Sequence, residues 1–198
     1  MKKFTKHQRM TRMVFCAIMI ALITVMTFVP NIGYIAIGVI ELTTIQIVVA
    51  LGACLLGPGY GTILGAAWGI TCLIRAFTNP AWIMFTNPLI SVLPRVLVGL
   101  CAAGTFLLFK KLLKLPNFVA ALASGAAASI TNTAFVLTSI YIFGEMTNFY
   151  GSAYELIKGI LSTILALNGG LELVASAVLV PLLFTAVSKQ AKKYGISQ

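Results

Sequence analysis

The side chains with the clearest chemical potential are polar residues set within long apolar stretches. Asn87, Ser91 and Arg95 follow one another at intervals of four residues, which places them on one face of a helix. An arginine offers a planar fork of donors that can hold a carboxylate through two parallel hydrogen bonds. This face therefore indicates a binding site for an anionic group.

The elements that must position these residues belong to an unusually apolar chain. Of its 198 residues, 60% are hydrophobic and 9% are charged. A water-soluble domain carries about 25% charged residues, so we expect lipid to solvate this surface. The four cysteines lie within apolar runs, without the spacing of metal ligands, and we expect neither a metal nor a cofactor in this chain.

The positive charge is concentrated outside the apolar runs. Of the 14 basic residues, five lie in residues 2–12, three in 110–114 and three in 189–193, whereas all four acids lie elsewhere. This asymmetry follows the positive-inside rule, which places both termini in the cytoplasm and argues against a nucleic-acid partner. A multi-pass protein of the cell membrane is therefore expected.

Six apolar runs match or approach the length of a spanning helix, which is about 20 residues. The loop 144–170 is less apolar and is expected outside, with a break at its Asn-Gly-Gly end. Within this loop, 154–165 is interpreted as an interfacial helix, because a seventh span would put the basic tail outside. The prediction is one all-α domain over 1–198 with six transmembrane helices, at 11–30, 43–56, 60–76, 88–113, 116–143 and 171–188.

The predicted orientation divides each helix into an inner and an outer half of different polarity. Past Asn117, the inner halves hold no charged or amide side chain. A channel or pump needs a polar lining through its whole depth, so we expect a ligand pocket that opens outward and is sealed below. The outer halves and their loops hold Glu41, Thr43, Thr44, Gln46, Trp68, Arg75, Asn79, Asn87, Ser91, Arg95, Asn132, Ser139, Asn168 and Glu172.

Seven of these residues form the predicted substrate site. Arg95 lies about 10 Å into the membrane, where a charge costs roughly 2.5–3.5 kcal/mol, so it needs a partner. That partner is either Glu172 or a ligand carboxylate, and the guanidinium fork favours the ligand. Asn132 serves either a ligand or helix association, and Trp68 is expected to wall the pocket. The predicted site is Trp68, Asn87, Ser91, Arg95, Asn132, Glu172 and Thr43.

Two other classes of function are open but disfavoured. An intramembrane enzyme acting on lipid would need a nucleophile with a base, or paired carboxylates. The only histidine, His7, lies in the cytoplasmic tail, which leaves Glu172 as a lone candidate base. A stand-alone carrier is disfavoured by the apolar inner halves.

Small residues recur at four-residue intervals in two places. Ala17 and Ala21 form one such pair, and Gly61, Gly65 and Gly69 form two overlapping ones. These patterns usually serve close packing within one chain. A binding module sealed below needs another subunit to move it, so one such face is expected to dock a partner.

Several motifs, in their order along nearly the whole chain, resemble substrate-binding S components of energy-coupling factor (ECF) vitamin transporters. They are the basic N-terminus leading to Ala17 and Ala21, the turn at 55–61, the Asn-Pro-rich third loop, Leu-Pro-Arg ending at Arg95, and Thr-Asn-Thr around Asn132. The resemblance implies six helices around a vitamin pocket that the first and third loops close. It also implies that Ala17 and Ala21 pack against a transmembrane T subunit carrying two ATPase subunits.

Within this family the chain is most similar to the pantothenate subgroup, and an anionic substrate suits Arg95. A carrier of pyridoxine or hydroxymethylpyrimidine is the closest alternative. The resemblance implies a bacterial, non-catalytic subunit whose partners hydrolyse ATP, and which topples in the membrane to release its vitamin inside. The segment after the fifth helix is longer than a minimal S component needs.

Overall fold

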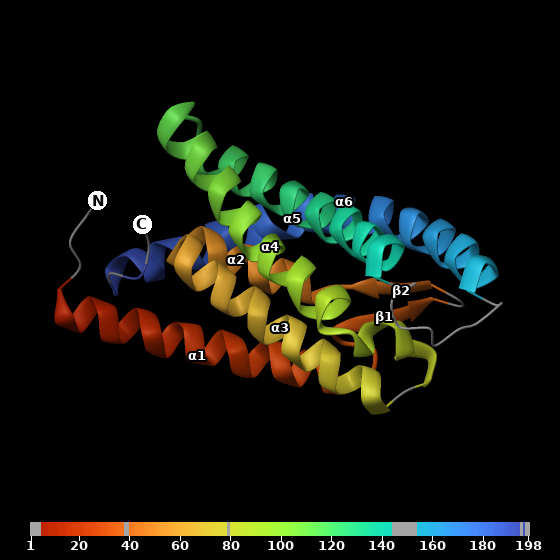
Figure 1. The fold of residues 1–198 in the computed structure, drawn as a ribbon. Helices are drawn as coiled ribbons and strands as arrows, with labels where there is room; N and C mark the ends of the chain where they lie inside the picture. The colour runs from red at the N-terminus through yellow and green to blue at the C-terminus, as the bar shows by residue number, and fades with distance from the viewer. Residues whose placement is uncertain (1–4, 38–39, 79, 144–153, 195, 197–198) are drawn as a thin grey trace.

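The structure, a computed structural model, describes residues 5–37, 40–78, 80–143, 154–194 and 196. It is a bundle of long helices with a two-stranded hairpin at one end (Figure 1). The strands β1 (Tyr34–Ile37) and β2 (Ile40–Thr43) pair antiparallel, η1 (Pro80–Thr86) is a 3-10 helix, and η2 (Leu108–Leu112) extends α4 as a π-helix. The α-helices are α1 (Lys6–Phe28), α2 (Ile45–Leu56), α3 (Pro58–Thr78), α4 (Pro88–Leu107), α5 (Asn117–Phe143) and α6 (Tyr154–Lys193).

Five helical segments of the described chain are long and apolar enough to cross a membrane. They are Lys6–Phe28, Pro58–Thr78, Pro88–Leu112, Asn117–Phe143 and Asn168–Lys193. The helix α2 has 12 residues, about 18 Å at 1.5 Å per residue, and is too short to span alone. Most of its side chains are buried against the other helices, so α2 forms part of the core rather than a lipid-facing column. The described residues therefore have apolar helices at the six predicted positions, five of them of spanning length.

The hairpin corrects the all-α prediction. Tyr34 pairs with Thr43 and Ile37 with Ile40, directly after α1 and before α2. Both segments are rich in the β-branched and aromatic residues that favour strands, but each has only four residues. The predicted second helix consequently begins at Ile45 rather than at residue 43.

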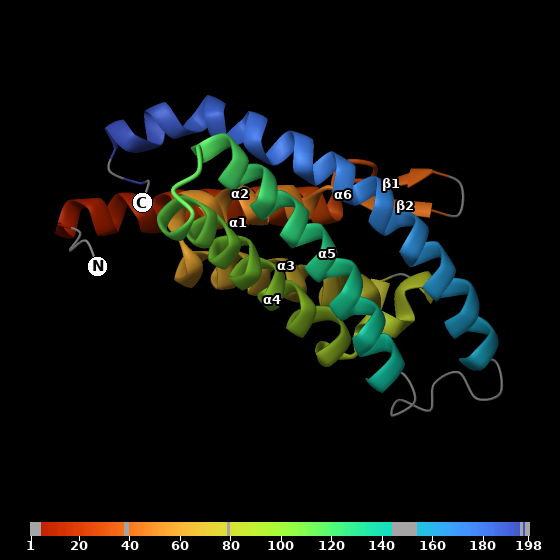
Figure 2. The same ribbon diagram turned by 90° about the horizontal axis from the view of Figure 1, so that it is seen from above.

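The helix α6 also differs from the prediction. It runs for 40 residues, through the Asn-Gly-Gly sequence at which an outside loop over 144–170 was expected to end. The proposed interfacial helix over 154–165 lies within α6, and residues 144–153 lie outside the described chain. Seen from above, α6 runs alongside α5 (Figure 2).

Contacts outside α6 explain why the helix continues there. The amide of Asn168 donates 3.1 Å to the carbonyl oxygen of Glu41 in β2, so it does not compete for the backbone of its own helix. A Cβ added at Gly169 would lie 2.8 Å from the hydroxyl oxygen of Thr133. The glycine therefore lets α5 and α6 approach closely, a use that small residues often serve in membrane helices.

The predicted glycine face packs α3 against α4. A Cβ added at Gly61 would lie 2.6 Å from the carbonyl oxygen of Gly99, and one at Gly69 would lie 2.6 Å from the Cα of Val92. Neither backbone atom can move aside cheaply, so this face is used within the chain. Ala17 and Ala21, in contrast, are exposed on α1.

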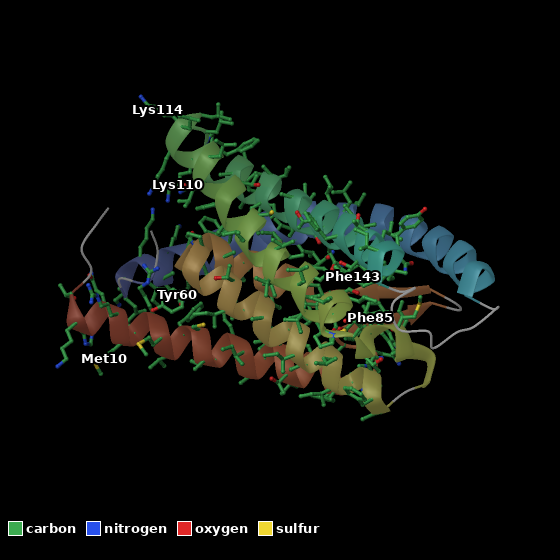
Figure 3. All side chains as sticks on the ribbon, viewed as in Figure 1. Met10, Tyr60, Phe85, Lys110, Lys114 and Phe143 are labelled. Atoms are coloured by element: carbon green, nitrogen blue, oxygen red, sulfur yellow. The ribbon has the colours of Figure 1, made fainter. Side chains whose placement is uncertain are left out.

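The two ends of the bundle differ in their side chains. Lys110 and Lys114 lie toward the same end as Met10, whereas Phe85 lies toward the hairpin end (Figure 3). Arg12, one of the basic residues before the first apolar run, is buried at the end of the bundle where Met10 lies. It donates from Nη2 to the carbonyl oxygen of Leu56 at the end of α2 and lies over the Tyr60 ring.

Candidate functional site

Arg95 lies in an aromatic setting near the hairpin end of the bundle. Its guanidinium carbon is 5.3 Å from the Trp68 ring centroid and 5.0 Å from that of Phe85. Trp68 is fully buried, and its Nε1 donates to the hydroxyl oxygen of Tyr34 at 3.1 Å. The predicted pair of Arg95 and Trp68 is thus brought together, with Trp68 held in place by the hairpin.

The guanidinium of Arg95 is only partly satisfied. The residue is 4% exposed, its Nη1 donates to the carbonyl oxygen of Ile90 at 2.8 Å, and its Nε has no hydrogen-bond partner. Within the described chain no carboxylate oxygen lies within 4.0 Å of it, so the ion pair with Glu172 is not formed. Because a buried cation is costly without a counter-charge, this group is suited to receive an anion.

Glu172 is instead bound to the hairpin. Its Oε1 accepts from the backbone N–H of Thr43 at 2.7 Å, and the side chains of Thr43 and Asn132 lie close to its carboxylate. Three of the predicted site residues therefore meet one another, on β2, α5 and α6. These contacts place Glu172 as a link between the hairpin and the helices.

The bond of Glu172 is one of three that fasten α6 to the segment running from β2 into α2. The α6 residues lie four apart, on one face of the helix, and their partners follow in order along β2 and α2. The hairpin is thus fixed against α6 by side-chain hydrogen bonds rather than by apolar contact alone. The pairs are Asn168 with Glu41, Glu172 with Thr43 and Gln46 with Ser176, at 3.1, 2.7 and 3.0 Å.

Several buried polar atoms at this level of the bundle lack a partner. Buried polar groups are normally hydrogen-bonded, so an unpaired set at one level indicates a place for a polar ligand. Gln46 and Asn168 were expected among the polar residues of the outer halves but outside the seven-residue site, and Ser129 was not singled out. Within the described chain, the unpaired atoms of this set are Arg95 Nε, Gln46 Oε1, Ser129 Oγ, Asn132 Oδ1 and Asn168 Oδ1.

A second arginine ties together the loops above the site. The guanidinium carbon of Arg75 is 4.2 Å from the Tyr34 ring centroid and 4.4 Å from the Trp82 ring centroid, and its Nη1 lies 3.7 Å from Oε2 of Glu41. These contacts join α3, the hairpin and η1. Burial raises the pKa of the Glu41 carboxyl, while Arg75 opposes that rise. Burial also holds the pKa of the Tyr34 phenol well above its ordinary value, so the phenol stays neutral.

Asn87 and Ser91 have local roles at the start of α4. The side chain of Asn87 accepts from the N–H of Leu89 at 2.9 Å and Pro88 occupies the first turn, so Asn87 caps the helix. Ser91 is buried and donates to the carbonyl oxygen of Asn87 at 3.0 Å. Both side chains are thus satisfied within their own helix, unlike that of Arg95.

Comparison with known proteins identifies the family of the chain. The family described as "ECF transporter, substrate-specific component" matches residues 11–184 of the chain. The chain therefore belongs to this family, and the predicted family is confirmed. Its members are transport components rather than enzymes.

Two relatives of the chain are pantothenate transporters. The chain is 32% identical over 197 residues to the pantothenate transporter PanT of Leuconostoc mesenteroides subsp. mesenteroides, covering 93% of this chain and 95% of that protein. It is 26% identical over 192 residues to the pantothenic acid transporter PanT of Lactococcus lactis subsp. cremoris, covering 89% and 91% of the two chains. The predicted resemblance to pantothenate carriers is confirmed by both.

A solved structure shares the fold. The S-component for biotin from an ECF-type ABC transporter has a TM-score of 0.57 and 16% identity, over 96% of this chain and 95% of that one. At this low identity the likeness concerns the path of the chain and not its ligand.

Proposed function

We propose that this chain is the high-affinity pantothenate-binding subunit of an ECF-type importer. The observation that carries the proposal is Arg95, a buried cation with an unpaired Nε and no carboxylate within 4.0 Å in the described chain. A ligand carboxylate would supply the missing counter-charge and accept from the free side of the guanidinium. The similarity to two pantothenate transporters supports the same substrate.

The chemistry of Arg95 also separates pantothenate from the closest alternatives. Pantothenate carries a carboxylate at one end and hydroxyl groups at the other, with an amide between them. Pyridoxine and hydroxymethylpyrimidine carry no carboxylate, so neither would neutralise Arg95. The unpaired oxygens of Asn132 and Asn168 offer further bonds to a ligand of this polar kind.

We further propose that transport depends on partner subunits in the bacterial plasma membrane. Ala17 and Ala21 are exposed on α1, among large apolar side chains such as Met13, Ile18 and Leu22. Such a face of small and apolar residues is suited to close contact with another membrane helix. In this proposal it docks on a transmembrane T subunit, two ATPase subunits supply the energy, and the chain topples to release pantothenate on the cytoplasmic side, where both of its termini lie.

A binding screen tests the substrate. The purified chain in lipid nanodiscs would be titrated calorimetrically with pantothenate, biotin, pyridoxine and hydroxymethylpyrimidine. We expect one-to-one binding of pantothenate and at least about 30-fold weaker binding of pyridoxine and hydroxymethylpyrimidine, because leaving the buried Arg95 without a carboxylate costs about 2–5 kcal/mol. Biotin is an informative control because it also has a carboxylate. Tighter binding of any of the other three would refute the assignment.

Reconstitution tests the dependence on partners. Proteoliposomes that contain this chain alone are expected to bind radiolabelled pantothenate without accumulating it. Accumulation by the chain alone would favour the stand-alone carrier, and release of lipid hydrolysis products would favour an enzyme.

A further inference from the structure

The unpaired polar atoms at the site differ in hydrogen-bonding character from one side of the bundle to the other. On α4 the unpaired atom is a donor, the Nε of Arg95. On α5 and α6 the unpaired amide atoms are acceptors, Oδ1 of Asn132 and Oδ1 of Asn168. The three residues are 4%, 8% and 5% exposed, so bulk water does not satisfy these atoms. The α4 side of the site therefore needs an acceptor from a ligand, and the α5 and α6 side needs donors.

The neighbours of the two asparagines fix which way their amides face. An amide can be rotated so that its oxygen and nitrogen exchange places, and only its partners decide between the two. The amide of Asn168 bonds to the backbone carbonyl of Glu41, which can only accept. The amide of Asn132 lies beside the carboxylate of Glu172, an acceptor that attracts the amide N–H and repels the amide oxygen. Both amide nitrogens therefore face acceptors, and both oxygens are left to accept.

The two asparagines belong to one small region. Asn168 lies one helical turn from Glu172 on the same face of α6, and Asn132 reaches Glu172 from α5. Gly169 lies against Thr133 and brings the two helices together at this level. Arg95 is near enough to Glu172 for an electrostatic interaction, although the two do not form an ion pair. The cationic and the accepting sides thus face the same part of the bundle.

We propose that Asn132 and Asn168 form a subsite for ligand hydroxyl groups, opposite the carboxylate position at Arg95. The ligand class is an acid whose other end carries hydroxyl groups. This inference rests on the proposed function and adds what selects the non-anionic end of the substrate. An analogue without the hydroxyl groups leaves both buried oxygens unpaired, which is how a polar site rejects an apolar analogue of its ligand.

The first test uses ligands alone and requires no variant. The wild-type chain in nanodiscs is titrated with pantothenate and with its dideoxy analogue, in which hydrogen replaces both hydroxyl groups while the amide and carboxylate remain. We expect the analogue to bind at least about 100-fold more weakly, from roughly tenfold or more for each unpaired acceptor. Affinities within about threefold of each other would overturn the inference. Failure to bind pantothenate at all would instead overturn the proposed function.

Variants then assign the discrimination to the two asparagines. Asn132→Leu and Asn168→Leu keep the side-chain volume and remove the acceptor. Each is expected to weaken pantothenate binding by roughly tenfold or more while leaving the analogue nearly unchanged, so that the ratio of affinities falls. A merely structural role would weaken both ligands equally and keep the ratio at its wild-type value, which would overturn the assignment.

A matched control comes from the same helix. Ser139 is buried on α5, seven residues from Asn132, and its hydroxyl is not among the unpaired atoms. Ser139→Ala is expected to leave the affinity ratio at the wild-type value. Thermal unfolding of each variant verifies that the chain is folded. Should either asparagine variant fail to fold, the wild-type ligand comparison and the other variant still decide the outcome.

Discussion

Replacing Arg95 by methionine should have opposite effects on ligand binding and on the stability of the empty chain. The side chain is 4% exposed, its Nε is unpaired, and the residues nearest its guanidinium include the rings of Trp68 and Phe85. Methionine has a similar length, fills the same apolar surroundings and brings no charge. The substitution therefore removes the proposed anion site without opening a cavity.

The expected sizes follow from the burial of Arg95. Removing one partner of a buried, hydrogen-bonded charge pair costs about 2–5 kcal/mol, which corresponds to a loss of affinity of about 30-fold to a few thousandfold. Solvent screening does not reduce this figure, because the group is nearly inaccessible. In the empty chain the same change removes a charge that costs roughly 2.5–3.5 kcal/mol at membrane depth, against the loss of one carbonyl bond and weak ring contacts. The melting temperature of the unliganded variant should thus equal or exceed that of the wild type.

Calorimetry in nanodiscs and thermal unfolding of the unliganded chain measure the two quantities. Arg75→Met is the matched control, because Arg75 is 21% exposed and already lies 3.7 Å from Glu41. Partly exposed pairs contribute about 0–1 kcal/mol, so this control should lose less than about tenfold in affinity. A second comparison uses pantothenol, in which an alcohol replaces the carboxylate. Pantothenol should bind the wild type weakly, and it should bind the Arg95→Met variant about as tightly as pantothenate binds that variant. An Arg95→Met chain that binds pantothenate within about threefold of the wild type would refute the assignment.

Three further predictions test other parts of the account. Ala17→Trp should abolish co-purification with the T and ATPase subunits and leave pantothenate affinity unchanged, because Ala17 is exposed on α1; a complex that still co-purifies would contradict the docking face. Gly65→Leu should lower the melting temperature strongly, since overpacking against backbone costs about 1–3 kcal/mol or more, whereas Gly104→Leu, with no atom within 4 Å of its added Cβ, should not. Glu41→Gln should be at least as stable as the wild type at neutral pH, because burial raises the pKa of Glu41 and ionised Glu41 disfavours the folded state despite Arg75. As the pH falls through the range in which that carboxyl is protonated, the melting temperature of the wild type should rise relative to that of the variant, and melting curves between about pH 7.5 and about pH 4 would show this change. A fall in the relative melting temperature of the wild type would show that the Arg75 pair dominates.

The helices could be predicted because local signals determine them. Apolar runs of spanning length and the breakers between them are visible in the sequence, and the Asn87-Pro88 cap opens α4 as its chemistry requires. The glycines at four-residue intervals likewise indicated close packing of helices, which Gly61 and Gly69 achieve against α4.

The hairpin and the course of α6 could not be predicted because they depend on each other. Two strands of four residues are marginal alone, and their partners on α6 lie more than 100 residues away in sequence, as the Asn168–Glu41 separation of 127 shows. Once Asn168 is committed to the hairpin, the Asn-Gly-Gly sequence no longer acts as a helix breaker. Local turn chemistry was overridden by a contact between distant segments.

Part of the site was visible in the sequence and part was not. The spacing of Asn87, Ser91 and Arg95 identified a polar face, but only tertiary structure shows that the first two are satisfied locally and Arg95 is not. Glu172 was a plausible partner for Arg95 until Thr43 was seen to occupy its carboxylate. Which buried groups lack a partner is a property of packing, and no spacing rule provides it.

A structure of the purified chain with pantothenate bound tests the central claim most directly. The account predicts the carboxylate within about 2.7–2.9 Å of the Arg95 guanidinium nitrogens, with the hydroxylated end toward Asn132 and Asn168. Density for the ligand with its carboxylate away from Arg95, or in a different part of the bundle, would contradict it.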